Sequence, residues 1–372
     1  MKLQVLQENL EKAVSIAARF ASTKAQLPIL GNILISAKRN KIYISSTNLE
    51  ISSSMQIGAK VEDEGEISIP AKVIMDIVSN LPKETIMLES EKEQLKISSS
   101  SFSSNVLGME STDFPKIPNS VKDVNAIVFS KKELSDGLSK VSFASSVDET
   151  RPILTGVLFI LEGVSLSLVA TDGFRLSKKT INLKDDKKVT KRVVIPKGVL
   201  NEIGRIVFET DEVLFDLEEN EKQVIFGLGD TILTSRLLEG EYPDFEKIIP
   251  KSFSTKILVD KEELLRSVKL ASIFARESAN VIKIKVLKDS IKVSAESGQA
   301  GSQETRVDAK VDMEIGESKD FEIAFNYRYV EEFLHSVTGE EVKMEFTGST
   351  TAGVFRDTGD SEYLHLIMPV KI

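Results

Sequence analysis

The chain has 372 residues, 41% of them apolar and 28% charged, a balance typical of a globular protein with roughly two or three domains. It contains no cysteine, which excludes disulfides, thiol catalysis and cysteine metal sites together. The 57 acidic residues exceed the 48 basic ones, which disfavours a surface that binds nucleic acid all over but is compatible with one basic face.

Further absences narrow the class of protein. No apolar run approaches the roughly 18 residues of a membrane span. The first residues, Met1 to Gln4, lack the basic and apolar stretches of a signal peptide, so we expect a cytoplasmic protein without a membrane partner. For the two histidines, His335 and His365, we expect structural or surface roles and no metal, because metal ligands occur in clusters with set spacing.

Six segments have the periodicity of short helices, each of about ten to fourteen residues. They begin near Gln7, Ala71, Lys131, Lys197, Lys261 and Tyr327. Successive starts are 60 to 66 residues apart, so the chain reads as six similar units of one helix and several strands. In the second helix, Val73, Ile74 and Ile77 predict one buried stripe.

Between the helices, polar and apolar residues alternate, as from Lys41 to Ser45. This pattern predicts antiparallel sheets with one covered face. The serine run from Ser98 to Ser104 is interrupted by Phe102. We therefore favour a strand there, with an edge strand as one option, over a flexible linker.

Two glycine motifs are interpreted as turns. Gly227 to Asp230 superficially resembles a phosphate-binding loop, but it lacks the lysine and hydroxyl of that motif and no helical pattern follows, which favours a hairpin turn. Asp172 and Gly173 stand between two strand-like segments and also predict a turn.

The six units pair into three larger repeats. Pro28 to Leu30 recurs 124 residues later as Pro152 to Leu154, and the apolar positions of the first helix recur in the third and fifth. We therefore predict an α+β protein of three similar domains, each with two helices packed against antiparallel sheets. The predicted domains are residues 1–120, 121–252 and 253–372, with boundaries in polar, proline-containing segments.

Basic residues recur in or beside the predicted helices. They are Lys12, Arg19, Lys132, Lys140, Arg205, Arg266, Lys269, Arg276 and Arg328. On isolated helices such residues are usually only solvated. If six like units form an arc, however, their charges add along one surface that could attract DNA phosphates without reading sequence. No motif of a serine hydrolase, zinc protease or kinase is present, so nothing indicates an enzyme.

Several motifs in a fixed order resemble those of the bacterial sliding clamps, the beta subunits of DNA polymerase III. The matching segments are Leu27 to Asn32, Ala170 to Leu176, Tyr242 to Phe245 and Ile367 to Ile372. The resemblance covers essentially the whole chain. It implies the DNA-clamp fold, no cofactor, and a homodimer whose two chains join head to tail into a ring lined by twelve helices. Duplex DNA would pass through the ring, which would hold the polymerase on its template.

The resemblance also implies a partner-peptide groove between the second and third domains, used by the replicative polymerase subunit, the clamp loader and other proteins with a clamp-binding motif. The matching positions are Leu154, Thr171, Gly173, Phe174, Arg175, Leu176, Pro243, Lys247, Ile248, Tyr329, Leu366, Met368, Pro369 and Val370. Ordinary core packing is the alternative for Leu366. Three residues depart from the common family pattern: Phe174 stands for a histidine, Lys247 for an arginine and Ala352 for a serine.

Two further sets follow from the resemblance. The DNA-facing positions are Lys12, Lys24, Lys197 and Arg205. The dimer-interface positions are Phe102, Val106, Leu107, Ile273 and Phe274. A peptide-binding scaffold that does not encircle DNA is the alternative to the clamp, and mixed charge on the helix faces would favour it.

Overall fold

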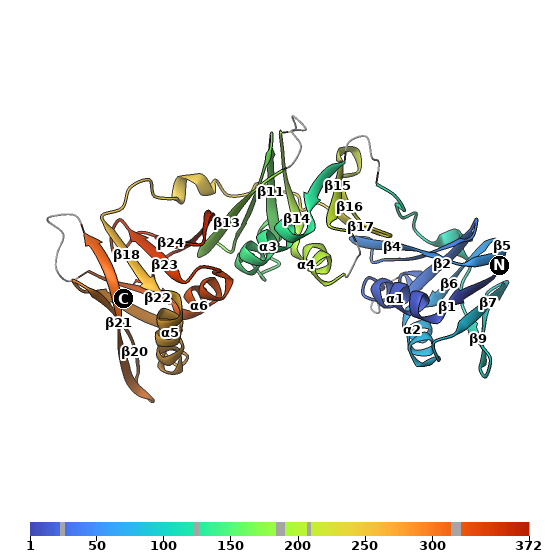
Figure 1. Cartoon of the computed structure of the whole chain (residues 1–372), viewed down its shortest axis with the longest axis horizontal. Coiled ribbons are helices and arrows are strands. Elements are labelled where there is room, and N and C mark those ends of the chain that lie inside the picture. Colours follow the sequence, from blue (N-terminus) through green and yellow to red (C-terminus); the bar gives the residue numbers. More distant parts are fainter. Residues whose placement is uncertain (23–26, 122–125, 184–189, 207–209, 314–320, 372) are drawn as a thin grey trace. The chain divides into compact units, whose positions relative to one another are not determined.

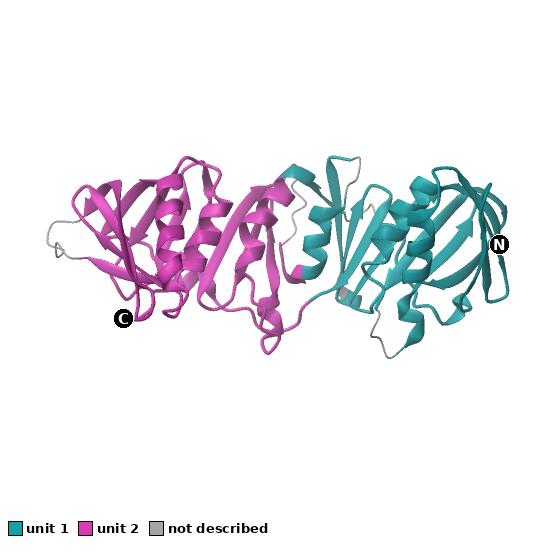
Figure 2. Ribbon diagram, turned by 90° about the horizontal axis from the view of Figure 1, so that it is seen from below, with its two compact units in different colours: residues 1–132, 198–237 teal, residues 133–197, 238–372 magenta. Residues whose placement is uncertain are grey.

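The computed structural model describes residues 1–22, 27–121, 126–183, 190–206, 210–313 and 321–371. The chain forms two compact units (Figure 2). Unit 1 consists of residues 1–132 and 198–237, and unit 2 of residues 133–197 and 238–372. Among the described residues, no helix is both long enough and apolar enough to cross a membrane.

The described residues contain six α-helices, and each begins at the residue that the periodicity predicts. They are α1 (Gln7–Ala17), α2 (Ala71–Asn80), α3 (Lys131–Val141), α4 (Lys197–Arg205), α5 (Lys261–Ala275) and α6 (Tyr327–Ser336). With 9 residues α4 is shorter than expected, and with 15 residues α5 is longer.

The strands fill the intervals between the helices. Those of unit 1 are β1 (Lys2–Leu6), β2 (Asn32–Lys38), β3 (Lys41–Thr47), β4 (Ile51–Gly58), β5 (Lys60–Asp63), β6 (Gly65–Pro70), β7 (Thr85–Glu91), β8 (Gln94–Ser98), β9 (Ser103–Leu107), β10 (Ile127–Ser130), β15 (Glu212–Glu218), β16 (Gln223–Leu228) and β17 (Thr231–Arg236). Those of unit 2 are β11 (Gly156–Glu162), β12 (Ser165–Thr171), β13 (Arg175–Asn182), β14 (Thr190–Pro196), β18 (Thr255–Asp260), β19 (Val281–Val286), β20 (Ser290–Ser297), β21 (Gly301–Met313), β22 (Glu322–Asn326), β23 (Glu341–Phe346), β24 (Gly353–Asp357) and β25 (Asp360–Ile367).

These strands form three sheets. Unit 1 holds a five-stranded sheet in the order β5-β1-β7-β8-β9 and an eight-stranded sheet in the order β10-β15-β16-β17-β4-β3-β2-β6. Unit 2 holds a twelve-stranded sheet in the order β14-β11-β12-β13-β25-β24-β23-β18-β21-β20-β19-β22. Neighbouring strands within the sheets are antiparallel, as the alternation predicts, for example β12 with β13 and β3 with β4.

The large sheets are continuous because the same strand pairing recurs at two joints. In unit 1, β4 pairs with β17, and in unit 2, β13 pairs with β25 (Figure 1). In each case a strand from one predicted domain is bonded to the last strand of the next. The sheets therefore cross the predicted domain boundaries, and the two compact units do not coincide with the three predicted domains.

Helices α1 and α2 pack side by side in unit 1, as do α5 and α6 in unit 2 (Figure 1). Helix α5 begins where the Asp260 carboxylate accepts the Glu263 N–H at 2.9 Å, which satisfies one of the first four unpaired donors of the helix. Its buried side includes Leu264, Val268 and Ala271, which face strands β20 and β21. The spacing of these residues explains why α5 covers this sheet.

The predicted stripe of α2 is partly wrong. Ile74 and Val78 are fully buried, but Val73 is 41% exposed and Met75 40% exposed. Helical geometry places Val73 and Met75 about 100° to either side of Ile74, so both flank the covered face. Periodicity located the helix correctly but could not show how wide a face is covered.

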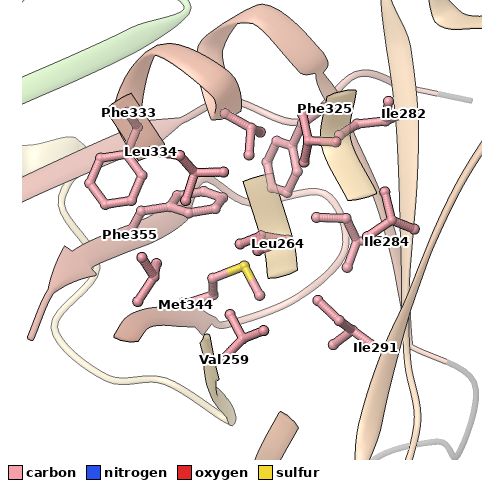
Figure 3. Packing of buried hydrophobic residues seen from close by; sticks show 14 of the residues in the cluster. Val259, Leu264, Ile282, Ile284, Ile291, Phe325, Phe333, Leu334, Met344 and Phe355 are labelled. Carbon is pink, nitrogen blue, oxygen red and sulfur yellow. The ribbon is translucent and has the colours of Figure 1, made fainter. Parts of the chain in front are cut away.

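The largest core lies in unit 2, where α5 and α6 meet the sheet (Figure 3). Phe333 of α6 packs against Phe355 and Tyr363, with ring centroids 5.6 and 5.7 Å apart. Phe325 and Phe355 make an edge contact at 5.5 Å. Aromatic pairs in such tilted arrangements stabilise a core beyond the area that they bury.

The turn predictions are confirmed. Gly227 to Asp230 forms the hairpin between β16 and β17, and Asp172 with Gly173 lies between β12 and β13. The serine run is not one strand: β8 ends at Ser98, and β9 begins only at Ser103. The second half of the run does lie in an edge strand, since β9 is the last strand of its sheet.

We predict that Phe333→Ala destabilises the protein by about 3–5 kcal/mol, because it leaves a cavity among buried rings that cannot fully collapse. Urea unfolding followed by far-UV circular dichroism would measure the change. Val147→Ala is the control, since Val147 is 92% exposed and its truncation should change stability by less than about 0.5 kcal/mol. Equal effects of the two substitutions would contradict the packing described.

Candidate functional site: the joint between β13 and β25

The tight turn between β12 and β13 runs from Thr171 to Arg175. All five of its residues except Asp172 are predicted groove residues. The Asp172 carboxylate accepts the N–H groups of Phe174 and Arg175 at 2.9 and 3.0 Å. The Thr171 hydroxyl accepts the Gly173 N–H at 3.0 Å and donates to the Arg175 carbonyl at 2.6 Å. Gly173 has a φ of 93°, which glycine adopts without strain. The turn therefore holds an exposed Phe174 on a fixed backbone.

The end of β25 lies directly beside this turn. Leu176 of β13 is the register partner of Leu366, and both side chains are fully buried. One step further, the Met368 N–H donates to the Phe174 carbonyl at 2.8 Å. Phe174 is 64% exposed and Met368 39%, so two apolar side chains face solvent where the backbones are bonded together.

An apolar cluster supports these exposed residues from below. Leu176 and Leu366 belong to it together with Phe245, Ala352 and Val354. Phe245 anchors the short 3₁₀-helix η6 (Phe245–Ile248), so the predicted groove segment around Pro243, Lys247 and Ile248 is attached to the same cluster. The burial of Leu366 agrees with its alternative interpretation as a core residue.

Arg175 connects the turn to α6. Its guanidinium contacts the carboxylates of Asp172, at 3.1 Å, and Glu332, and it donates to the Phe143 carbonyl at 2.8 Å. It also lies 4.5 Å from the centre of the Tyr329 ring. The side chain is only 8% exposed, and a buried arginine needs such partners for its charge and its donors.

The predicted groove residues all lie in unit 2 but differ in accessibility. Gly173, Phe174, Pro243, Lys247, Ile248, Met368 and Val370 are exposed, Tyr329 and Pro369 are half-buried, and Leu154, Thr171, Arg175, Leu176 and Leu366 are buried. The buried members fix the backbone and the exposed members form the surface that a partner can reach. Whether they bind a peptide together remains a prediction.

The first repeat contains the same turn. The Asn48 side chain accepts the N–H groups of Glu50 and Ile51, and the Thr47 hydroxyl accepts the Leu49 N–H at 2.9 Å. Leu49 has a φ of 74°, although a leucine rarely adopts this conformation. The backbone of the β3–β4 turn thus repeats that of the β12–β13 turn.

The two joints differ in the side chains that they present. The Arg236 N–H donates to the Glu50 carbonyl at 2.9 Å, in the same way that Met368 donates to Phe174. Charged Glu50 and Arg236 therefore stand where the second joint has Phe174 and Met368. The second joint therefore exposes two apolar side chains at positions where the first joint has charged ones.

The departures from the family pattern have different surroundings. Phe174 presents an exposed apolar ring. Lys247 is exposed and pairs with Asp244 at 2.8 Å, and the hydrogen bond from its ammonium group lowers the pKa of that carboxyl. Ala352 is buried in the apolar cluster, where it offers no polar atom to a partner.

The predicted DNA-facing residues are distributed over both units. Lys12 and Arg205 are exposed, and Arg205 pairs with Glu202 at 2.9 Å, as Arg19 does at 2.8 Å. Lys197 is half-buried, and burial together with the charge of Arg175 lowers the pKa of its ammonium group. Lys24 lies outside the described residues.

The predicted interface residues lie on or just before β9 in unit 1 and on α5 in unit 2. Leu107 is 70% exposed on β9, whereas Val106 is buried and Phe102 half-buried just before the strand. Ile273 is 57% exposed on α5, and Phe274 packs partly against the core. A hollow of about 390 Å³ beside Ile273 is also lined by Leu270, which sequence reasoning did not select.

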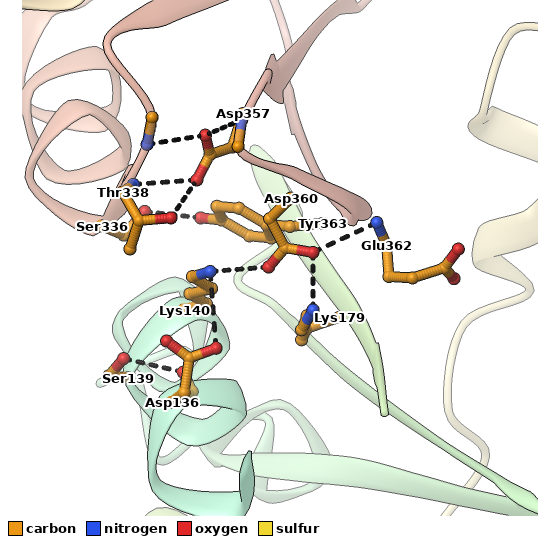
Figure 4. Close-up of polar contacts among 12 residues, drawn as sticks. Asp136, Ser139, Lys140, Lys179, Ser336, Thr338, Asp357, Asp360, Glu362 and Tyr363 are labelled. Carbon is orange, nitrogen blue, oxygen red and sulfur yellow. Dashed lines mark hydrogen bonds and ion pairs between the residues drawn. The ribbon is translucent and has the colours of Figure 1, made fainter. Parts of the chain in front are cut away.

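One basic helix residue is buried, which corrects its expected place on a polar face. Lys140 of α3 is 3% exposed and its ammonium group lies 2.6 Å from Asp360 and 3.4 Å from Asp136 (Figure 4). Lys179 of β13 contacts the other oxygen of Asp360 at 2.6 Å. Burial alone would raise the pKa of Asp360, but hydrogen bonds from Lys140 and Lys179 hold it below its usual value. No sequence motif marks this cluster.

The two histidines have contrasting environments. His335 is exposed near the end of α6 and lies 3.8 Å from Glu331. His365 is completely buried, with Nδ1 2.6 Å from the Ser177 hydroxyl and its ring stacked on Phe333 at 5.3 Å. Among the described residues, no group of three or more His, Cys, Asp or Glu side chains could hold a metal ion.

Three like domains, whose six helices lie against antiparallel sheets shared across the joints, define this protein as a DNA clamp. Models of the three domains of the DNA polymerase III beta subunit match the chain: the N-terminal domain over residues 1–118, the central domain over 129–244 and the C-terminal domain over 246–371. The chain belongs to the DNA polymerase III beta subunit family, the bacterial sliding clamps.

Similar proteins span the same length. The beta sliding clamp of Staphylococcus aureus is 32% identical over 360 residues, which cover 94% of each chain. The crystal structure of the DNA polymerase sliding clamp from Bacillus subtilis is 28% identical, with a TM-score of 0.94 over 100% of this chain and 99% of that one. A putative DNA polymerase III beta subunit from Eubacterium rectale is 27% identical, with a TM-score of 0.92 and complete coverage of both chains.

We predict that His365 makes stability fall with acidification. Burial, reinforced by the charge of Arg175, holds the pKa of His365 well below the ordinary value of 6.5. Below pH 6.5 the unfolded chain therefore binds a proton that the folded chain does not, and the free energy of unfolding falls by up to about 2 kcal/mol by pH 5. Urea unfolding at several pH values measures this slope.

His365→Asn should flatten the slope between pH 6.5 and pH 5, whereas the same change at exposed His335 should leave it as in the unsubstituted protein. A slope that persists in the His365 variant would show that another group is responsible.

Proposed function

We propose that two copies of this chain close head to tail into a ring around duplex DNA and tether the replication machinery to it without any catalytic step. The ring works in the cytoplasm, on the chromosome. Because it encircles the DNA, it stays on the duplex without tight contacts and does not need a strongly basic surface. This agrees with the composition, in which 57 acidic residues outnumber 48 basic ones. Residues 1–120, 121–252 and 253–372 are the proposed domains.

The recurrence of one strand pairing carries this proposal. In each repeat one strand follows its hairpin partner: β4 follows β3, β13 follows β12 and β21 follows β20. Another strand ends a run of antiparallel strands: β9 in the first repeat, β17 in the second and β25 in the third. Two of the three possible joints are made within the chain, β4 with β17 and β13 with β25. The remaining halves, β21 and β9, are the two ends that a second copy would join.

Both remaining halves have an unused edge within the described part of the chain. β9 pairs only with β8. Residues 301–308 of β21 pair only with β20, because β18 bonds to residues 309–313. Unpaired strand edges are templates for further pairing. Two such contacts between identical chains are heterologous, and they close a ring if the rotation allows it.

Exposed apolar residues on two helices support the same joint. Ile273 and Leu270 are exposed on α5, next to β21, and Val73 and Met75 are exposed on α2 of the first domain. Exposed apolar residues gathered on one helix are unusual on the surface of a monomer and indicate a contact. We propose that these two faces meet across the interface, together with Leu107 and Val106 of β9, Phe102 and Phe274.

Among the described residues, the proposed DNA contacts are the exposed Lys12 and Arg205 and the half-buried Lys197. Their attraction to phosphate is independent of sequence and falls with salt, as sliding requires. Duplex DNA, a second copy of this chain, the replicative polymerase subunit and the clamp loader are thus the proposed partners.

The partner groove is proposed at the joint between β13 and β25. Phe174, Met368, Val370 and Ile248 supply exposed apolar surface, and the half-buried Tyr329 lies under the guanidinium of Arg175. Methionine and aromatic side chains suit a site that accepts several partner peptides with apolar anchors.

The ring predicts a topological test. After a clamp loader places the protein on nicked circular DNA, it should remain bound in high salt and be lost once the circle is cut. Ile273→Arg should weaken dimerisation at least about 30-fold, because it buries an unpaired charge at the interface. Sedimentation velocity and gel filtration of the loaded DNA provide both measurements.

Val164→Arg is the matched control, because Val164 is an exposed valine, 48% accessible, in the turn between β11 and β12, and neither of these strands carries an open edge of the proposed joint. It should dimerise and load normally. Equal retention on linear and circular DNA, or a stable monomer, would overturn the ring and favour a peptide-binding scaffold.

The proposed groove predicts that partner binding can be lost while the dimer stays intact. Phe174→Ala and Met368→Ala should each weaken the binding of a fluorescent peptide by at least about tenfold, because each removes apolar contact area. The peptide carries the clamp-binding motif of the polymerase subunit. Fluorescence anisotropy measures the affinity, and sedimentation checks that the dimer is intact.

Glu50→Ala and Arg236→Ala are the matched controls, since these residues occupy the same backbone positions at the joint between β4 and β17. They should leave peptide affinity unchanged. Equal losses at both joints would contradict a single groove in each chain.

A further inference from the structure

The partner groove depends on the register in which β13 pairs with β25. Arg175 stands opposite Ile367, Leu176 opposite Leu366 and Lys178 opposite Leu364. Because side chains alternate across a strand, Leu364 and Leu366 face the apolar cluster while His365 faces the opposite core. A shift by one residue would turn His365 toward the groove.

A shift by two residues would be harder to prevent by apolar pattern alone. It keeps each face of β25 on its own side, with Leu364 in place of Leu366, but it moves Met368 along the groove by about 7 Å. Apolar contacts are non-directional and tolerate such an exchange. Directional polar contacts must therefore distinguish the two registers.

Two buried polar contacts do distinguish them. Ser177 and His365 are register partners, both completely buried, with 2.6 Å between the hydroxyl and Nδ1. A two-residue shift would place Ser177 opposite Tyr363 or Ile367 and leave the buried His365 Nδ1 without this partner. Losing such a buried hydrogen bond is costly.

The second contact is a clasp at the start of β25. Asp360 binds Lys179 of β13 through one oxygen and Lys140 of α3 through the other, each at 2.6 Å (Figure 4). The Lys140 side chain is 3% exposed and those of Lys179 and Asp360 are 10% and 12% exposed. A shift of β25 would withdraw the carboxylate from two buried ammonium groups.

We propose that Asp360, Lys140 and Lys179, together with Ser177 and His365, are positioning residues that lock the register of β13 and β25 and thereby place Leu366 and Met368 in the partner groove. This inference rests on the proposed groove at the same joint. Buried ion pairs add little net stability compared with apolar residues, so their role here is to select one pairing.

The other internal joint uses a different device. There Arg19 of α1 bridges to Glu202 of α4, with 39% of the arginine side chain exposed. Between β4 and β17 the register partners include Ser52 with Thr234 and Ser53 with Leu233, none of which carries a charge. Among the described residues, the charged clasp that ties a strand to the preceding domain, Asp360 with Lys140 and Lys179, lies at the joint that carries the proposed groove.

The absence of cysteine allows a direct test of register. Lys178→Cys with Leu364→Cys places two cysteines at directly opposite positions, where a disulfide can form. Lys178→Cys with Glu362→Cys reports a shift by two residues. Each pair is introduced into the unsubstituted clasp and into a triple variant, Lys140→Met, Lys179→Met and Asp360→Leu, whose apolar side chains keep the joint packed.

With the clasp intact, the native pair should cross-link almost completely and the shifted pair hardly at all. In the triple variant the native yield should fall at least about twofold, the shifted pair should appear, and affinity for the labelled clamp-binding peptide should fall at least about tenfold. Oxidation of the native pair in the triple variant should then restore peptide affinity to within about threefold of the clasp-intact disulfide protein. The shifted cross-link separates a change of register from merely lost stability, because a disulfide by itself also stabilises the folded chain.

Circular dichroism and sedimentation verify that the triple variant is folded and dimeric, and Asp360→Asn provides a second, smaller perturbation that should show the same direction of change. Glu202→Gln at the other joint is the control and should leave both cross-links and peptide affinity unchanged. A triple variant with native cross-linking and native affinity would overturn the lock, as would lost affinity that the disulfide fails to restore.

The cross-links also separate this inference from the groove itself. If cross-linking depends on the clasp but the unsubstituted protein does not bind the peptide, the proposed groove fails and the register lock stands. If the peptide binds but cross-linking ignores the clasp, the lock fails and the groove stands.

Discussion

The need of every strand edge for a partner is the constraint on which this molecule depends. Backbone donors and acceptors at an edge must be paired or solvated. The chain satisfies two such edges internally, by joining β4 to β17 and β13 to β25, and so carries sheets across its domain boundaries. Of the strands that correspond to these two joints, β9 and residues 301–308 of β21 keep an unpaired edge, and the same constraint makes them the natural place for a second copy. The proposed assembly thus extends the rule that builds the monomer.

Repetition of backbone with variation of side chains explains how one joint can acquire a function that the other lacks. The turns at Thr47 and Thr171 have the same hydrogen bonds, and the following strands make the same contact with the next domain. Charged Glu50 and Arg236 occupy one joint, and apolar Phe174 and Met368 the other. Because the backbone is fixed equally at both, a few side chains decide which surface attracts apolar peptides.

Buried polar and charged groups hold together the joint that carries the proposed groove. Arg175 ties the turn to α6, Asp360 ties β25 to α3 and β13, and His365 pairs with Ser177 across the strands. Each group is costly to bury without its partner, which makes alternative arrangements of the joint unfavourable. The same burial makes His365 titrate far from its ordinary range.

The sequence by itself determined the six helix starts, the alternating strands, the turns at Asp172 and Gly229 and the threefold repeat, because periodicity and turn chemistry are local. It also supplied the motifs of the family. Only the tertiary structure decided that Lys140 points inward to Asp360, 220 residues away, and that Val73 remains uncovered. A periodic pattern shows that a face is apolar or basic, but which distant element covers that face depends on how the sheets pair.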